Sequence, residues 1–109
     1  MKIFVFRAIV VFLNFIGTLN IALAAEINVS QKGKVFNPTE IEVAKGDVII
    51  FKNDDTVAHN VFTAEKGQPF NLKIQKPGEE GKLVVTASTD FKVRCAIHPK
   101  MQLKIKIKK

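Results

Sequence analysis

The sequence has 109 residues with 17 basic and 10 acidic side chains, which gives a formal net charge of +7. A chain of this length can bury one two-layer core but is too short for a second domain. A single cysteine excludes an internal disulfide, and two histidines leave few groups for acid–base or metal chemistry.

The N-terminal segment is predicted to be a secretory signal peptide. A basic start precedes a largely apolar stretch, and Ala22-Leu23-Ala24 supplies small residues at the two positions that a signal peptidase inspects. We expect cleavage after Ala24 or Ala25. The signal would then cover residues 1–24 and the domain residues 25–109.

An uncleaved membrane anchor is the alternative interpretation of this segment. Arg7, Asn14 and Asn20 interrupt the apolar residues, whereas a spanning helix needs a clean run of about 18. We therefore favour the cleaved signal and expect no stable membrane insertion once it is removed.

From Glu26 onward the pattern has the period of two that is typical of strands, with turn residues every eight to twelve positions. Ile27 and Val29 alternate with polar neighbours. The continuous apolar run over residues 48–51 suggests a strand covered on both faces. Residues 67–81 are the least regular section. Together these features predict an all-β fold, a Greek-key antiparallel β-sandwich.

Two residues whose side chains could react or bind a metal share the parity of apolar neighbours. His59 has the same parity as Val57 and Val61, and Cys95 has the same parity as Val93. Since alternate residues of a strand face the same side, both His59 and Cys95 are expected to face the core.

The last predicted strand is the most regular. Every second residue from 101 to 107 is apolar, and lysines occupy positions 104, 106 and 108. We interpret these lysines as a solvated face. No aromatic residues accompany them and the export signal points away from nucleic acid, so we expect no nucleic-acid partner. An acidic protein partner remains open.

A group of potential metal ligands lies around the junction of the last two predicted strands. Cys95, His98 and Met101 follow the spacing C-x2-H-x2-M, and His59 lies on another predicted strand. Copper binds thiolate, imidazole and thioether, and a trigonal His2Cys plane with a weak axial Met is typical of electron-transfer sites. We predict His59, Cys95, His98 and Met101 as the metal ligands and no catalytic residues.

Each of these residues also has a purely structural interpretation. A lone inward cysteine usually acts as a small hydrophobic residue, His59 could be a satisfied core histidine, and Met101 could begin a core strand. Their joint spacing in an exported β chain favours a metal. Zinc would make little use of a thioether, and covalent haem attachment needs a second cysteine, so we expect one copper ion.

Several segments resemble small blue copper proteins, the cupredoxins. The loop that begins at Cys95 is most similar to that of amicyanin, and His59-Asn60-Val61 is similar to the first-histidine strand of plastocyanin. The resemblance extends over residues 27–107. The runs that resemble the opening strands of plastocyanin-type cupredoxins are Phe36-Asn37-Pro38, Ile41-Glu42-Val43 and Gly46-Asp47-Val48-Ile49-Ile50-Phe51.

The resemblance implies a type 1 copper site with His59, Cys95 and His98 as equatorial ligands and Met101 as the axial one. Asn60 would tie the two ligand loops together and hydrogen-bond near the Cys95 sulfur. The implied partners are redox proteins, such as a c-type cytochrome or a periplasmic dehydrogenase, and the protein is expected to be a monomer.

We therefore expect a soluble periplasmic one-electron carrier. An enzyme would need an open coordination position or further histidines, and both histidines are already assigned. A periplasmic copper carrier or storage protein is the alternative, although such proteins usually have Met- or His-rich tails, which this chain lacks.

The electron is expected to enter and leave at His98. This residue lies between Ile97 and Pro99, so its outer edge should be exposed within a small apolar patch. Lys100 would lie beside the patch and Lys66 close by, where both could steer an acidic docking face.

Overall fold

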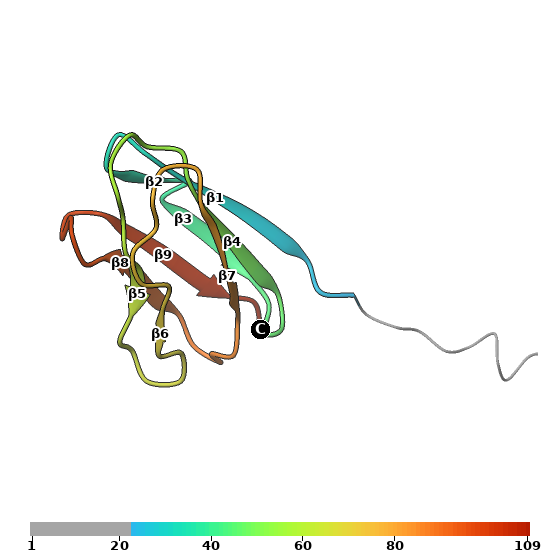
Figure 1. Ribbon diagram of the computed structural model, residues 1–109. Coiled ribbons are helices and arrows are strands. Elements are labelled where there is room, and N and C mark those ends of the chain that lie inside the picture. Colours follow the sequence, from blue (N-terminus) through green and yellow to red (C-terminus); the bar gives the residue numbers. More distant parts are fainter. Residues whose placement is uncertain (1–22) are drawn as a thin grey trace, which may run out of the picture.

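The computed structural model of the protein describes residues 23–109 (Figure 1). The predicted signal peptide, residues 1–24, lies outside the described residues apart from its last two positions. Residues 23–109 form strands and connecting loops, and they include no helix of the length and apolar character needed to cross a membrane.

Nine strands occur in the described part of the chain. In chain order they are β1 (Glu26–Lys32), β2 (Val35–Asn37), β3 (Glu40–Val43), β4 (Val48–Asn53), β5 (Val61–Thr63), β6 (Phe70–Asn71), β7 (Glu80–Val84), β8 (Phe91–Cys95) and β9 (Gln102–Ile107). They form a four-stranded sheet in the order β2-β1-β4-β7 and a five-stranded sheet in the order β3-β9-β8-β5-β6. The all-β sandwich predicted from the sequence is confirmed.

Each sheet contains one parallel pair among antiparallel neighbours, where we had expected antiparallel pairing throughout. β1 runs parallel to β4, and β3 runs parallel to β9. The chain moves to the second sheet between β2 and β3 and returns for β4, so β4 enters beside β1 in the same direction. A period of two shows which face a residue occupies but not the direction of its neighbouring strand.

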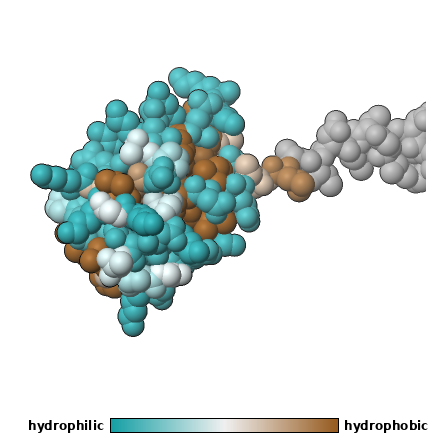
Figure 2. All heavy atoms as spheres, turned by 90° about the horizontal axis from the view of Figure 1, so that it is seen from above, coloured by the Kyte–Doolittle hydropathy of each residue, from teal (hydrophilic) through white to brown (hydrophobic). Residues whose placement is uncertain are grey.

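The core lies between the two sheets and consists of their inward-facing side chains. Phe51 of β4 is fully buried and packs edge-on against Phe36 of β2, with ring centroids 6.2 Å apart. Our expectation that residues 48–51 are covered on both faces is wrong for the outer face. Val48 and Ile50 are only half-buried, because they point away from the opposite sheet. The face shown in Figure 2 is mainly hydrophilic, with smaller hydrophobic areas.

The strand order brings the candidate metal ligands together. β8 lies between β9 and β5, and its last residue, Cys95, pairs with Val61 at the start of β5. His59 precedes Val61 by two positions. A loop over residues 96–101 joins β8 to β9. This end of the five-stranded sheet therefore holds one candidate from the chain before β5, one from the end of β8 and two from the β8–β9 loop.

Candidate metal centre

Cys95 is a free cysteine that is buried at the end of β8. Cys95 shares the parity of the buried Val93 and alternates with the exposed Arg94, so its side chain faces the core, as predicted. The backbone N–H of Asn60 donates to the Cys95 Sγ at 3.3 Å, and the carbonyl of Asn60 accepts from the N–H of Ala96 at 2.9 Å. Two backbone contacts thus tie the segment after His59 to the start of the β8–β9 loop.

Asn60 connects the two ligand segments as the resemblance implies, but it does so through its backbone. Its side-chain amide instead donates to the Oδ1 of Asn71 on β6, at 2.8 Å. The contact to the Cys95 sulfur therefore depends on the position of the peptide group and not on the side chain of Asn60.

His59 is fully buried and faces the core, as its parity predicted. The predicted strand does not extend through it, because β5 begins only at Val61. His59 instead forms an isolated β-bridge with Gln75, with backbone hydrogen bonds of 3.0 and 2.7 Å in the two directions. Val57, which shares its parity, is exposed in the preceding loop.

The Gln75 segment is held in turn by buried amides. Asn53 donates through its side chain to the carbonyl of Gln75 at 3.0 Å, and Gln31 donates to the Gln75 Oε1 at 3.0 Å. All three amide side chains are buried. Our sequence analysis missed this support for His59, because Gln75 lies in the irregular section and its pattern contains no signal of such a role.

His98 lies in the β8–β9 loop and is half-buried. The carbonyl of His98 accepts a hydrogen bond from the N–H of Met101 at 2.9 Å, which closes the loop. Burial of the ring lowers the pKa of His98 from its ordinary value, and the neighbouring His59 and the charge of Lys34 lower this pKa further. A lowered pKa keeps the imidazole neutral, as a metal ligand must be.

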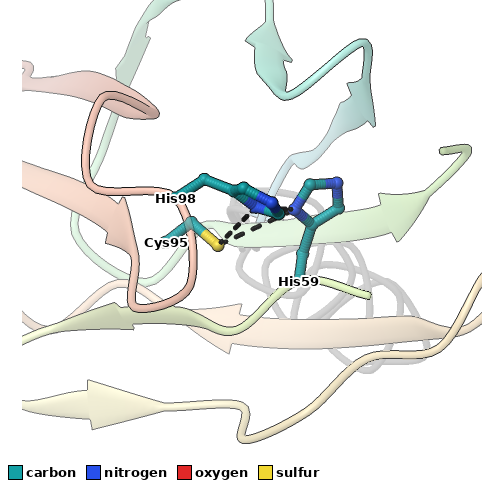
Figure 3. Close-up of side chains that lie close together, drawn as sticks. All are labelled: His59, Cys95 and His98. Carbon is teal, nitrogen blue, oxygen red and sulfur yellow. Dashed lines mark hydrogen bonds between the residues drawn. The ribbon is translucent and has the colours of Figure 1, made fainter. Parts of the chain in front are cut away.

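Three of the predicted ligands converge at one point (Figure 3). The Cys95 Sγ lies 3.7 Å from the Nδ1 of His59 and 3.7 Å from the Nδ1 of His98, and the two nitrogens are 3.1 Å apart. A point equidistant from the three atoms lies about 2.0 Å from each, close to the lengths of metal–imidazole and metal–thiolate bonds. These residues therefore fit a trigonal copper site.

Met101, the fourth predicted ligand, directly precedes β9 and is only 1% exposed. Its N–H bonds to His98, so the residue is fixed to the same loop. The core packing of Met101 is also what a purely structural role would require, so its role as axial ligand stays a prediction.

Asp55 contacts His59 on the side opposite to the site, and our sequence analysis did not predict this contact. Its Oδ2 lies 3.0 Å from the His59 Nε2 and also accepts the backbone N–H of Lys34 at 2.9 Å. The N–H of Lys34 and the His59 ring hold the pKa of Asp55 well below its ordinary range. The sequence did contain one signal of this contact, which is a carboxylate four residues before a candidate ligand.

The turn between β1 and β2 brings Lys34 to this position. Gly33 and Lys34 both have positive φ, 63° and 60°, as in a type I′ hairpin turn. Glycine adopts this geometry at no steric cost, whereas Lys34 is constrained to it. The turn is therefore anchored to the loop before His59 through Asp55.

A shallow hollow lies beside the exposed edge of His98. Its lining consists of Lys34, Ile97, His98, Pro99 and Lys100, and Ile97 is 45% exposed. The apolar patch predicted around His98 is confirmed.

The expectation that Lys66 lies near this hollow is wrong, because it is Lys34 that lines the hollow beside Lys100. The neighbour of Lys66, Glu65, accepts a hydrogen bond from the N–H of Lys92 at 2.7 Å. Lys92 is near the start of β8, whereas Cys95 is at its end.

Comparison with known proteins identifies the family. Residues 23–108 match the copper binding proteins of the plastocyanin/azurin family. The chain belongs to this family. The chloroplastic plastocyanin of Silene latifolia subsp. alba is 32% identical to this family member over 90 residues, which cover 71% of this chain and 54% of that protein. This chain thus spans about half the length of the first relatives that it matches.

Solved structures agree with this assignment at the level of the fold. Amicyanin from Paracoccus versutus superposes on this plastocyanin/azurin family member with a TM-score of 0.67 and 14% identity, over 82% of this chain and 86% of that chain. A copper-containing nitrite reductase from Thermus scotoductus SA-01 gives 0.70 and 21%, over 84% of this chain and 24% of that chain. The fold is that of a cupredoxin, and its donor set fits one type 1 copper.

Proposed function

We propose that the protein is a periplasmic electron carrier that uses one type 1 copper ion. The observation that carries this proposal is the convergence of the Cys95 sulfur with the Nδ1 atoms of His59 and His98. These three residues are proposed as the equatorial ligands and Met101 as the axial one. When bound, copper supplies a one-electron couple.

The protein matrix around the donors is suited to this role. His59 is fixed by its bridge to Gln75, and the Cys95 sulfur is fixed by β8 and by the N–H of Asn60. A site whose donors are fixed by the surrounding chain changes little when the charge of its ion changes, and this favours rapid electron transfer. The ring of His98 is half-buried, and the electron passes to a partner through the exposed edge of this ring.

The small number of histidines in this chain argues against catalysis. The sequence contains two, and both belong to the proposed copper site. The nitrite reductase that shares the fold is about four times as long as the matched region, since the match covers 24% of it. We propose that this chain carries electrons and supplies no second copper centre.

The partners are proposed to be redox proteins that dock at the hollow beside His98, such as a c-type cytochrome or a periplasmic dehydrogenase. Lys34 and Lys100 at the hollow favour an acidic docking face. The signal peptide predicted from the sequence supports the proposed periplasmic location, and we propose that the carrier acts as a monomer.

An optical spectrum of the copper(II)-loaded protein tests this function. We expect an intense visible band from charge transfer between the Cys95 thiolate and copper, and its loss in Cys95→Ser. Ser lacks the sulfur but keeps a similar size, so the variant should fold. A colourless copper(II) complex of the parent protein, or an unchanged band in the variant, would show that the site is not type 1 copper.

A further inference from the structure

The carboxylate of Asp47 holds the residue that directly precedes β1. Asp47 follows the turn between β3 and β4 and is only 8% exposed. Its Oδ1 accepts the backbone N–H of Ala25 at 3.0 Å, and its Oδ2 accepts the N–H of Ala44 at 2.8 Å. The carbonyl of Ala25 in turn accepts the N–H of Val48 at 2.9 Å. Both backbone polar groups of Ala25 are thus fixed to the domain.

The chain immediately before Ala25 is accessible. Leu23 is 89% exposed, and Ala24 is also exposed and lies outside any strand. The segment leaves the sandwich just ahead of β1 (Figure 1). A peptidase can therefore reach the Ala24–Ala25 bond without opening the β-sandwich.

We infer that the chain is cut between Ala24 and Ala25 and that the new α-ammonium group of Ala25 pairs with the Asp47 carboxylate. Water supplies the atoms for this hydrolysis. Its hydroxyl joins the carbonyl carbon of Ala24, the C–N bond breaks, and the nitrogen of Ala25 takes the remaining hydrogen and one further proton from solvent. The Asp47 Oδ1 then accepts from a charged donor at the site where it now accepts from an amide.

The alternative cut after Ala25 is disfavoured in two independent ways. It places Leu23 where a small residue is required, whereas the cut after Ala24 places Ala22 there. It also removes Ala25 and with it the hydrogen bonds to Asp47 and from Val48. Of the two cuts, only the one after Ala24 leaves Asp47 with both of its backbone partners.

The surroundings of Asp47 favour a positive charge on Ala25. The N–H groups of Ala44 and Ala25, followed by the charge of Lys108, hold the pKa of Asp47 below its ordinary value, against the opposing effect of burial. Two further charged residues are adjacent in the sequence, since Glu26 follows Ala25 and Lys45 follows Ala44. The bond from the amide of Ala25 already has an ionised acceptor, and cleavage would make its donor a charged group as well.

The cleavage site is tested by expressing the full-length chain in a bacterium with a secretory pathway and measuring the intact mass of the exported protein. We expect a chain that begins at Ala25. A mature chain that begins at Glu26, or an exported chain that is still uncut, would overturn the inference.

The ion pair is tested by titrating the α-amine of the exported protein with NMR. An opposite charge favours the ionised form, so we expect the pKa of the α-amine to lie above its ordinary value of about 7.8. Asp47→Asn should restore the ordinary value, and Asp90→Asn should not. Asp90 is the matched control, because its Oδ1 also accepts a backbone N–H, that of Ile107. An ordinary pKa in the parent protein overturns the pairing even if Asp47→Asn does not fold.

The stability of the same variants gives a second readout. A pKa raised by folding contributes stability below about pH 7.8, and this contribution is lost as the pH rises through the raised pKa. Asp47→Asn should therefore lower Tm more at pH 7 than at about pH 10, whereas the loss for Asp90→Asn should not change in this way. An equal loss for Asp47→Asn at both pH values would contradict an ion pair.

Discussion

At the scale of single residues, Asp55 determines which nitrogen of His59 faces the proposed copper ion. Its Oδ2 lies 3.0 Å from the Nε2, so a neutral His59 carries its proton on Nε2 and has a lone pair on Nδ1. This Nδ1 is the atom directed at Cys95 and His98. A carboxylate in this position orients the ring and makes it a stronger donor.

Replacement of Asp55 by Asn tests the effect of its charge. The amide oxygen can still accept the Nε2 proton, but the negative charge that favours oxidised copper is removed. We expect a higher reduction potential and a copper affinity about 10–100-fold lower, measured by redox titration and by competition with a chelator. Asp54→Asn is the control, since Asp54 bonds to Ser30 and not to His59. Equal shifts in both variants would show that Asp55 has no specific effect.

Met101→Leu tests the axial position. The side chain is buried, and a swap of similar volume costs less than about 1.5 kcal/mol, so the variant should fold. A weak axial donor tunes the potential and contributes little to the visible band. We expect the colour to remain and the potential to rise, measured by optical spectroscopy with voltammetry. Loss of copper binding would instead make Met101 a principal ligand, and an unchanged potential would mean that it is no ligand.

At the scale of elements, the site depends on a short segment outside the regular strands. His59 lies before the start of β5, outside the regular pairing of that strand. Its bridge to Gln75 adds backbone hydrogen bonds there. Gln75 is also bonded to Gln31 of β1 and to the Phe51 carbonyl of β4. The four-stranded sheet therefore supports a ligand that belongs to the other side of the sandwich.

Gln75→Ala tests this support between the sheets. The substitution removes the acceptor of the Gln31 amide in a buried position, which should cost about 1–3 kcal/mol. Urea unfolding of the apo protein measures the loss, and the visible band of the copper protein should broaden as His59 gains freedom. Gln102→Ala on the exposed face of β9 is the matched control. A loss no larger than that of the control would mean that Gln75 is dispensable.

At the scale of the whole molecule, positive charge lies near the hollow where a partner reaches His98. Lys34 arrives from the β1–β2 turn and Lys100 from the β8–β9 loop, whereas Lys66 follows β5. Charges on the rim of a contact mainly change the rate of association. The position of each lysine relative to His98 therefore decides whether it steers a partner.

Charge reversal at Lys34 and Lys100 tests this steering with hexacyanoferrate(III), a small anionic oxidant. Lys34→Glu and Lys100→Glu should each slow oxidation of the reduced protein in stopped flow, by about 10-fold at 0.01 M salt. The effect should shrink at 0.1 M, since the Debye length falls from about 30 to 10 Å. Lys66→Glu is the control with the same change in net charge. Equal slowing by all three variants would refute local steering at His98.

The sequence by itself determined the local properties of the protein. The period of two predicted the strands and the inward orientation of Cys95, because side chains of a strand alternate between its faces. The spacing of Cys95, His98 and Met101 predicted that a single loop carries several ligands, and this loop does follow β8. These features depend on neighbours within a few residues, so a single segment is sufficient to specify them.

Only the tertiary structure decided which distant segments meet. The parallel pairing of β1 with β4, the bridge that positions His59 and the placement of Lys34 instead of Lys66 each depend on hydrogen bonds or packing between remote parts of the chain. Asp55 stands four residues from His59, but its role required the β1–β2 turn to supply the N–H of Lys34. Periodicity records the face that a residue occupies, whereas the free energy of pairing and burial selects its neighbours.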